Sequence, residues 1–324
     1  MAGGWAAGVT RARALRTRCL GPEGIREVAG APSLDAALRH LAATSYRRDL
    51  TPDASLAEGQ RAVSATLLWH LRVLAGWQPS TGAHAIRLLA ADFEISNTEQ
   101  HLRTLSGPEP TPSSPEPGRV CPPTEPYRLG ALATAWPRIA RTRSSSDLRM
   151  TLANSPWGDP GDDSPSAVAT GMRVSAALRT AAAVPEAGRW AAGRLALLIG
   201  REVFLVGRRI PEPSARRVAR LLGPRSLRAG SFADFRQALP TAASWALDGL
   251  GEAADLWRAE VRWWDVVDRD GWALLGRSRF TSEPVVGAVA VLSADAWRTR
   301  GALELAARGG GSVDWPAEVS DGPG

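Results

Sequence analysis

Apolar residues recur along this chain at spacings of three and four, the period of one face of an α-helix. The clearest runs are Val63, Leu67, Leu71 and Leu74; Ile86, Leu89 and Phe93; Leu250, Ala254, Trp257, Val261 and Trp264; and Val285, Val289, Leu292, Ala296 and Leu303. The strict alternation of a half-buried strand is nearly absent. The sequence therefore predicts an all-α fold.

Helix start and stop signals support this prediction. Ser33 precedes an Ala- and Leu-rich run and is expected to cap its N-terminus. Pro213 and Ser214 precede a run that ends before Gly223 and Pro224, a typical stop. The serines at 144–146 are likewise expected to be cap and turn residues.

A weak internal repeat occurs three times, at residues 37–46, 147–157 and 234–245. Each copy has an apolar–Arg pair, then leucine, then small or polar residues, and ends on an aromatic residue: Tyr46, Trp157 or Trp245. This pattern predicts a short helix, a stop and an aromatic plug, followed by a longer helix. The chain is therefore expected to contain three similar helical units.

The clearest boundary is the proline-rich stretch from Gly107 to Pro126, which cannot form a helix and predicts a spacer. The glycines from Gly309 onward predict a flexible tail. The expected organisation is helical unit 1 (1–107), linker (108–126), helical unit 2 (127–224), helical unit 3 (225–308) and tail (309–324).

All 39 basic residues are arginine, and the chain has no lysine. This excludes P-loop ATPases, protein kinases, pyridoxal enzymes and serine β-lactamases, which need a lysine for phosphate binding, a Schiff base or nucleophile activation. The net charge is +6 and the isoelectric point about 10.6. The arginines are interpreted as mostly spread along the chain, so charge alone indicates no function.

The chain has two cysteines, Cys19 and Cys121, far apart and outside any CxxC pair. Two cysteines are too few for a secreted disulfide framework, so a reducing compartment is expected. Neither a signal peptide nor a run of about 18 apolar residues is found, so no transmembrane segment is expected.

No residue is assigned a catalytic, cofactor-binding or metal-binding role. The four histidines, His40, His70, His84 and His101, lack ligand spacing on one helix face. The run from Asp159 to Asp163 lacks the EF-hand alternation and is expected to be a solvated turn rather than a cation site. Gly249-Leu250-Gly251 falls within a helical pattern without a preceding strand, which argues against dinucleotide binding.

Two other groups have a possible interface role. Trp257 and Trp264 lie on an apolar stripe and are expected in the core, whereas Trp263 lies off the stripe and is the better interface candidate. The N-terminal arginines, Arg11, Arg13, Arg16 and Arg18, are expected on solvated helix flanks with partners such as Glu23 or Glu27. The alternative for them is a basic surface facing an acidic stalk or lipid headgroups.

Three patches of the first hundred residues, in order, resemble the C/d-type central-stalk family of the V/A-type rotary ATPases, which includes the V-ATPase d subunit. They are Val9–Leu20 (VTRARALRTRCL), Ser33–Tyr46 (SLDAAL, ending in LAATSY), and Asp92–Asn97 (DFEISN) continuing to Leu102-Arg103. Weaker likeness follows at Asp147-Leu148-Arg149, at Ser155-Pro156-Trp157-Gly158, and at Gly188–Ala191 before Arg201-Glu202. The absence of lysine and the long proline-rich spacer depart from the family's usual pattern.

The resemblance implies an all-α funnel of three similar units with pseudo-threefold arrangement. It implies a non-catalytic central-stalk subunit without cofactors, which couples the rotating shaft to the membrane rotor ring for proton or sodium translocation. Its partners would be the shaft subunits and the proteolipid ring, with no nucleic acid. It would lie peripherally, on the cytoplasmic face of the membrane. The alternative is a basic helical adaptor or nucleic-acid-binding protein, favoured by the high isoelectric point.

Overall fold

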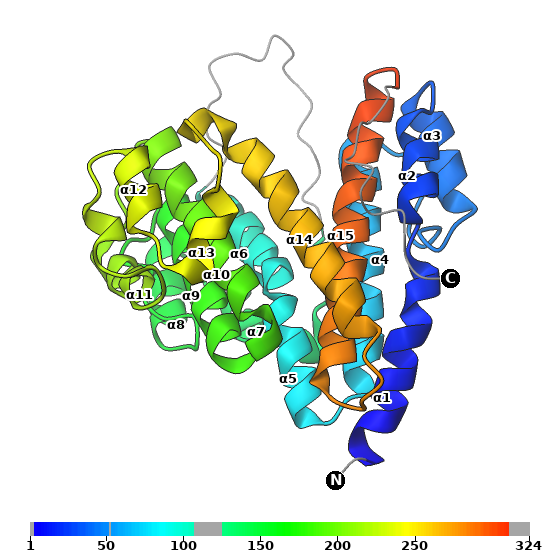
Figure 1. Cartoon of the computed structure of the whole chain (residues 1–324), viewed down its shortest axis with the longest axis horizontal. Helices are drawn as coiled ribbons and strands as arrows, with labels where there is room; N and C mark the ends of the chain where they lie inside the picture. Colours follow the sequence, from blue (N-terminus) through cyan, green and yellow to red (C-terminus); the bar gives the residue numbers. More distant parts are fainter. Residues whose placement is uncertain (1–2, 52, 107–124, 311–324) are drawn as a thin grey trace. The chain divides into compact units, whose positions relative to one another are not determined.

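The computed structural model describes residues 3–51, 53–106 and 125–310, and every regular element within them is a helix (Figure 1). The predicted all-α class is confirmed. The chain divides into two compact units: unit 1 comprises 1–86 and 264–324, and unit 2 comprises 87–263. The predicted division at 107, 126 and 224 stays a prediction. Most of the proline-rich linker and of the tail lies outside the described residues, as does Cys121.

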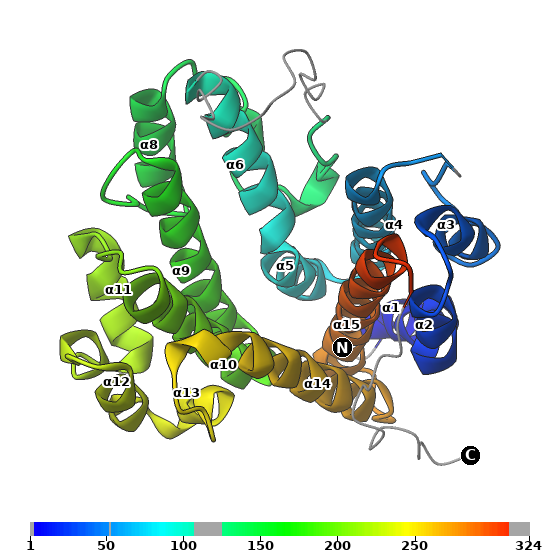
Figure 2. The ribbon, with the colours of Figure 1, turned by 90° about the horizontal axis from the view of Figure 1, so that it is seen from above.

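Unit 1 is organised around one long C-terminal helix. Its elements are α1 (Gly3–Ala14), α2 (Gly21–Ala29), α3 (Leu34–Ala42), α4 (Leu56–Gly76), most of α5 (Ser80–Leu89), the end of α14 (Leu256–Leu275), and α15 (Ser282–Ala307). Helix α15 packs against α1, α2, α3 and α4 (Figure 2). Its predicted apolar face is confirmed, since every residue of that run is buried.

The helix signals predicted in unit 1 are also present. The Ser33 hydroxyl accepts a hydrogen bond from the Ala36 N–H and caps α3. The run from Val63 to Leu74 lies within α4, which begins at a capping box formed by Ser55 and Glu58.

Helices α14 and α15 approach each other through glycines. A Cβ atom on Gly287 would lie 2.5 Å from the Gly271 carbonyl oxygen and 2.6 Å from the Leu275 nitrogen. Such distances leave no room for a side chain, so glycine is required for this close helix contact.

Unit 2 is built around α9 and α10. Its elements are α6 (Ala91–Ser106), α7 (Trp136–Ile139), α8 (Ser145–Ala153), α9 (Pro165–Ala183), α10 (Gly188–Ile199), a π-helical turn (Gly200–Leu205), α11 (Glu212–Leu222), α12 (Phe232–Ala238), α13 (Thr241–Ser244), and the start of α14. Helix α9 packs against α6, α10 and α11, and α10 also packs against α13. The predicted caps are confirmed at Ser144, which accepts the Asp147 N–H, and at Gly223, which ends α11 with φ of +81°.

A buried carboxylate on α15 joins three segments of unit 1. The Asp295 side chain accepts the Leu20 and Gly21 backbone N–H groups, each at 3.0 Å, and the Tyr46 hydroxyl at 2.7 Å. The Thr299 hydroxyl, one turn later, donates to the Asp295 carbonyl. We call this arrangement a carboxylate lock: one buried acid holds the start of a short helix and the aromatic residue that follows the next short helix.

The same arrangement occurs in unit 2. Glu94 on α6 accepts the successive Thr134 and Ala135 N–H groups and the Trp157 indole N–H, the last at 2.9 Å. The Thr98 hydroxyl donates to the Glu94 carbonyl, as Thr299 does in unit 1. Glu94 and Trp157 are 2% and 1% exposed, and Asp295 and Tyr46 are 5% and 4% exposed, so the carboxylate and the aromatic donor of each lock are buried.

The segments that supply the two aromatic donors match in spacing. Each begins at a capping serine, Ser33 or Ser144; a hydroxyl follows 11 residues later, Thr44 or Ser155, and the aromatic residue 13 residues later. Each of these hydroxyls donates to a carbonyl three residues back and accepts the N–H of the aromatic residue. The first two copies of the predicted repeat therefore share a hydrogen-bond pattern.

The third copy shares only part of this pattern. Ser231 caps α12, but Ala242 stands where the hydroxyl residue would be, 11 positions on. The Trp245 indole N–H donates to the Ala242 carbonyl at 3.0 Å instead of to a carboxylate. Its ring lies over Gly193 of α10, where a Cβ atom would approach it to 2.8 Å.

The predicted apolar stripe on α14 is wrong by one residue. Leu250 and Ala254 precede the helix, and Trp257 is 62% exposed rather than in the core. The buried positions on α14 are Leu256, Ala259, Val267, Asp268, Gly271 and Leu275. Both lines satisfy helical spacing, so periodicity alone could not separate them. The exposed Trp257 ring is covered in part by the Arg258 guanidinium, 5.1 Å from its centroid.

Candidate functional site

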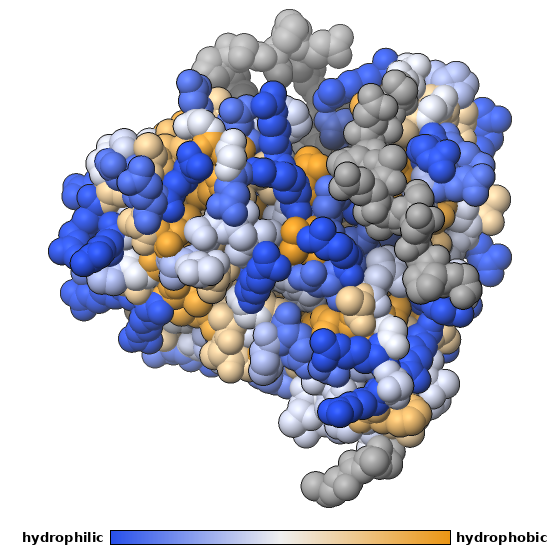
Figure 3. Space-filling view, viewed as in Figure 1, coloured by the Kyte–Doolittle hydropathy of each residue, from blue (hydrophilic) through white to orange (hydrophobic). Residues whose placement is uncertain are grey.

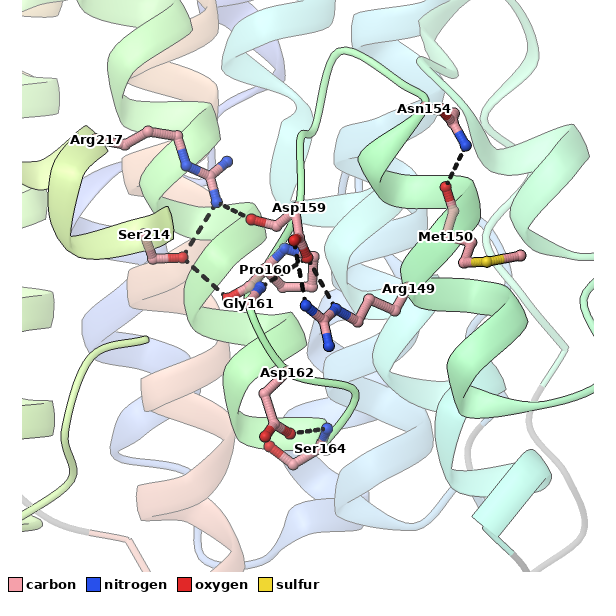
Figure 4. Close-up of polar contacts among 10 residues, drawn as sticks. All are labelled: Arg149, Met150, Asn154, Asp159, Pro160, Gly161, Asp162, Ser164, Ser214 and Arg217. Atoms are coloured by element: carbon pink, nitrogen blue, oxygen red, sulfur yellow. Dashed lines mark hydrogen bonds and ion pairs between the residues drawn. The ribbon is translucent and has the colours of Figure 1, made fainter. Parts of the chain in front are cut away.

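The most elaborate polar cluster lies in the loop between α8 and α9 (Figure 4). Arg149 holds Asp159 with two hydrogen bonds, from Nε at 2.9 Å and from Nη2 at 3.2 Å. Gly158 and Gly161 adopt φ values of +74° and +94°, which favour glycine. The Gly161 N–H also donates to Asp159 Oδ1 at 2.9 Å. The loop is therefore held in one conformation.

Arg217 of α11 closes the cluster from the other side (Figure 4). Its guanidinium donates to the carbonyls of Trp157 and Asp159, at 2.7 and 2.6 Å, and to Ser214 Oγ. The Ser214 hydroxyl in turn donates to the Pro160 carbonyl at 3.2 Å. Arg217 thus joins α11 to the loop that follows Trp157, the aromatic donor of the lock in unit 2.

The electrostatics of this cluster fix its charges. The Arg149 hydrogen bonds hold the pKa of Asp159 below its usual range and raise the pKa of Arg149. The Ser164 N–H and hydroxyl lower the pKa of Asp162. Burial lowers the pKa of Arg217 from its very high ordinary value. Such groups hold a structure and are not arranged to exchange a proton near neutral pH.

The Asp159–Asp163 run is a hydrogen-bonded loop in which Asp162 is exposed and Asp159 and Asp163 are half-buried. Each carboxylate has its own protein partner: Arg149 for Asp159, the Ser164 N–H for Asp162, and the Ser145 hydroxyl for Asp163. Among the residues that the structure describes, no group of three or more His, Cys, Asp or Glu could hold a metal ion.

A hollow of about 220 Å³ lies beside this loop. Its lining is mixed: Asp162, Ser164, Ser166, Ala167, Thr170, Glu202, Arg208, Arg209, Ile210 and Pro211. Glu202 and Arg208 pair across it at 3.1 Å. Typical small-molecule sites hold about 300–1,000 Å³, so this hollow is small, and much of its polar lining is already paired.

Unit 1 holds a second set of buried ionisable groups. Arg298 pairs with Asp265 and Asp268, and burial raises the pKa of Asp268. Burial also raises the pKa of the Cys19 thiol, with Asp295 adding to the effect. A thiol kept protonated is a poor nucleophile, which argues against a catalytic role for Cys19.

The histidines lie in separate places. His40 is half-buried and lies 3.3 Å from Glu27, His84 is exposed, and His101 bonds with Thr142. His70 is 6% exposed, and its Nδ1 is buried without a hydrogen-bond partner among the described residues. Burial and three nearby arginines lower the pKa of His70 to about 4.

The remaining candidates also differ from expectation. Trp263 donates to the Trp190 carbonyl at 2.9 Å and is half-buried in unit 2, so its indole is bound internally. Trp264 is half-buried and stacks on Trp297, with centroids 5.5 Å apart. Gly249-Leu250-Gly251 lies in a loop rather than in a helix.

The N-terminal arginines do not form the expected ion pairs. Arg13 donates to the Arg277 carbonyl and lies over the Phe280 ring, while Arg16 and Arg18 are exposed. Glu27 is paired with His40 instead. Arg11 is half-buried, and its Nε has no hydrogen-bond partner among the described residues.

The roles of the two lock carboxylates and of Arg217 were not predicted from the sequence. Asp295 and Glu94 each lie far along the chain from the groups they bind, so no local motif marks them. The available signal was the serine, hydroxyl and aromatic residue at positions 0, 11 and 13, which occurs in the first two repeat copies.

No protein-family model matches this chain, and no curated protein matches its sequence. In the described residues no helix is both long and apolar enough to cross a membrane. The polar clusters connect helices to one another and to the loops between them.

Proposed function

We propose that this chain is a non-catalytic central-stalk subunit of a V/A-type rotary ATPase. It couples the rotating shaft to the membrane rotor ring during proton or sodium translocation. In this proposal the three helical units, 1–107, 127–224 and 225–308, form a funnel with pseudo-threefold arrangement. One face grips the shaft subunits, and the other rests on the cytoplasmic loops of the proteolipid ring. The subunit is peripheral and has no active site of its own.

One observation carries the proposal: each of the three patches that resemble the C/d-type central-stalk family contributes a different part of a carboxylate lock. The patch Val9–Leu20 ends at Leu20, whose N–H binds Asp295. The patch Ser33–Tyr46 ends at the aromatic donor of the same lock. The third patch contains Glu94, the carboxylate of the other lock. The resemblance therefore covers residues that hold the helices together, which supports the proposal that this chain shares its fold with that family.

The locks also suit the mechanical role. A coupling subunit must transmit torque between two partners without yielding, so it needs helices that do not slide. Each lock joins a long helix to two short ones through three hydrogen bonds to a buried carboxylate, and hydrogen bonds to a charged acceptor are the stronger kind. Close-packed interiors add low compressibility. Stiffness therefore comes from the same residues that carry the resemblance.

One observation favours the second candidate, a basic helical adaptor or nucleic-acid-binding protein. Eight arginines lie between residues 201 and 228, which is denser than the spread predicted from the sequence. Seven of these eight arginines are exposed, so they can contact a partner in either role.

The first test is purification of the tagged full chain from gently solubilised membranes, with mass spectrometry of its partners and an untagged strain as control. The coupling role predicts recovery of nucleotide-binding catalytic subunits together with a small, very hydrophobic ring protein. Recovery of the chain alone, or with nucleic acid that survives about 0.3 M salt, contradicts it.

A second measurement tests coupling itself. Membrane vesicles from cells lacking this chain should keep nucleotide hydrolysis but lose ion pumping, because the motor and ring are no longer joined. Adding back the purified chain should restore pumping. Unchanged pumping without the chain contradicts the proposal.

A further inference from the structure

The positive charge of this chain is concentrated in one segment. Residues 201–228 contain eight arginines and two acidic residues, Glu202 and Glu212. The chain as a whole has 39 basic and 33 acidic residues, so the remainder has 31 of each. This segment alone thus accounts for the net charge of +6. The interpretation of the arginines as mostly spread does not hold here.

Most of these arginines face outward. All except Arg217 are exposed: Arg201, Arg208, Arg209, Arg216, Arg220, Arg225 and Arg228. On α11, the residues Ser214, Val218 and Leu222 are buried and set the outer face on which Arg216 and Arg220 lie. In the space-filling view, hydrophilic residues lie at the outer edge of unit 2 near α11 and α12, with apolar residues between them (Figure 3).

Few of the exposed arginines are neutralised. Arg208 pairs with Glu202 at 3.1 Å and Arg216 with Glu212 at 2.8 Å. The other five form no ion pair with any part of the chain that the structure describes: Arg201, Arg209, Arg220, Arg225 and Arg228. The surface therefore keeps unpaired guanidinium groups, each suited to bind phosphate oxygens in bidentate fashion.

Two exposed aliphatic residues lie among these arginines. The π-helical turn ends at Leu205, which is 50% exposed, and Val206 after it is 43% exposed. Gly207, with φ of +75°, then turns the chain into Arg208 and Arg209. An aliphatic tip flanked by arginines matches the boundary between lipid headgroups and acyl chains.

We propose that the 201–228 segment is a docking surface for a membrane bearing anionic phospholipids. The guanidinium groups bind headgroup phosphates, and Leu205 and Val206 enter the acyl boundary. A nucleic acid fits less well, because single strands are held largely by aromatic stacking and the segment exposes no aromatic ring. An acidic peptide would leave the aliphatic tip without a partner. The inference rests on this surface and not on the proposed coupling role.

The test uses the purified full chain and vesicles, with no other protein present. Flotation is compared between phosphatidylcholine vesicles and vesicles with about 30% phosphatidylglycerol, at about 0.1 M and about 0.5 M salt. The chain should bind the anionic vesicles only, and high salt should weaken the binding.

Variants locate the surface. The triple variant Arg209→Gln, Arg220→Gln, Arg225→Gln should bind about 100-fold more weakly, since each arginine near an anionic surface contributes about fivefold. The control Arg103→Gln, Arg141→Gln, Arg143→Gln changes three other exposed arginines of unit 2 and has the same net charge. It should bind within about threefold of the original chain. The pair Leu205→Ser, Val206→Ser should weaken binding without a change of charge. Circular dichroism confirms that all variants fold.

Equal binding to neutral and anionic vesicles, or equal loss in both triple variants, overturns the proposal. Tighter binding to a single-stranded oligonucleotide or to polyglutamate than to the anionic vesicles, abolished by the 209/220/225 variant alone, also overturns it and assigns the surface to that partner. Because no ATPase subunit is present, these outcomes are independent of the coupling role.

Discussion

The variant Tyr46→Phe tests whether the carboxylate lock stabilises unit 1. It removes one oxygen atom from a side chain that is 4% exposed and keeps the ring that fills the core. What is lost is the hydrogen bond from the Tyr46 hydroxyl to Asp295 Oδ2, 2.7 Å long. Asp295 then keeps only the Leu20 and Gly21 N–H groups as donors.

The expected loss of unfolding free energy is about 2 kcal/mol, because a hydrogen bond to a charged group contributes about 1.5–3 kcal/mol. Phenylalanine leaves almost no cavity, so no large packing loss adds to this figure. A loss of this size corresponds to a fall in melting temperature of about 4–8 °C for a domain of this length.

The loss should depend on pH with a definite sign. Burial raises the pKa of Asp295 above its ordinary 3.8, and the Tyr46 hydrogen bond opposes that rise by favouring the charged form. The stabilisation by Tyr46 is therefore full above the raised pKa, where Asp295 is ionised. It declines as the pH falls through the raised pKa and the carboxyl group becomes neutral. Urea titrations of both proteins from about pH 8 down to about pH 5 measure how this difference changes.

The control is Ser64→Ala, which removes a hydroxyl that bonds only to the Gln60 carbonyl within α4. It should change stability by less than about 0.5 kcal/mol, because alanine is a better helix former and no buried charge loses a partner. A Tyr46→Phe protein as stable as the original at every pH of the titration refutes the reasoning. So does a stability difference that grows on acidification.

Three further predictions concern single positions. Gly287→Ala should lower the free energy of unfolding by more than about 1 kcal/mol, because its methyl group would lie 2.5 Å from a carbonyl oxygen of α14. Gly301→Ala on the same helix has open space and should raise the free energy of unfolding by up to about 1 kcal/mol. Thermal melts in which Gly287→Ala is the more stable of the two variants contradict the close packing at Gly287. Arg217→Lys should lower the free energy of unfolding by about 2 kcal/mol, since an ammonium cannot reach all four acceptors, the carbonyls of Pro213, Trp157 and Asp159 and the Ser214 hydroxyl. The exposed Arg216→Lys should lower it by less than about 0.5 kcal/mol. Equal urea midpoints for the two variants contradict this. His70 should stay neutral down to about pH 4 in NMR titration. The unfolded chain takes up this proton near pH 6.5, so the free energy of unfolding should fall as the pH drops below about 6.5, and His70→Gln should remove that part of the pH dependence. A His70 that titrates near pH 6.5 in the folded protein contradicts its burial.

Local sequence signals predicted local structure well in this chain. The caps at Ser33 and Ser144 and the apolar face of α15 follow from short patterns read in one segment. Register on α14 failed because two adjacent lines of apolar residues both have helical spacing. Only the contacts with other helices choose between Trp257 and Leu256, and those contacts are not local.

The polar clusters could not be predicted for the same reason. The sequence separation between Tyr46 and Asp295 is 249 residues, and between Trp157 and Glu94 it is 63. A single acidic residue in a helix is ordinarily a solvated one, and nothing in its neighbours marks it as buried. The repeat did locate the aromatic donors, because their 13-residue distance from a capping serine is itself local.

The two locks nevertheless leave a signal that spans the chain. A buried carboxylate without its aromatic donor and its two N–H groups would be an uncompensated charge, which is costly. The acid, the aromatic residue and the threonine one turn after the acid should therefore change together among related sequences. The third repeat copy fits this logic: Trp245 has no carboxylate to bind, and a glycine lies beneath its ring. In this copy the Trp245 indole N–H donates to the Ala242 carbonyl, and Gly193 of α10 leaves room for the ring where the other copies have a carboxylate.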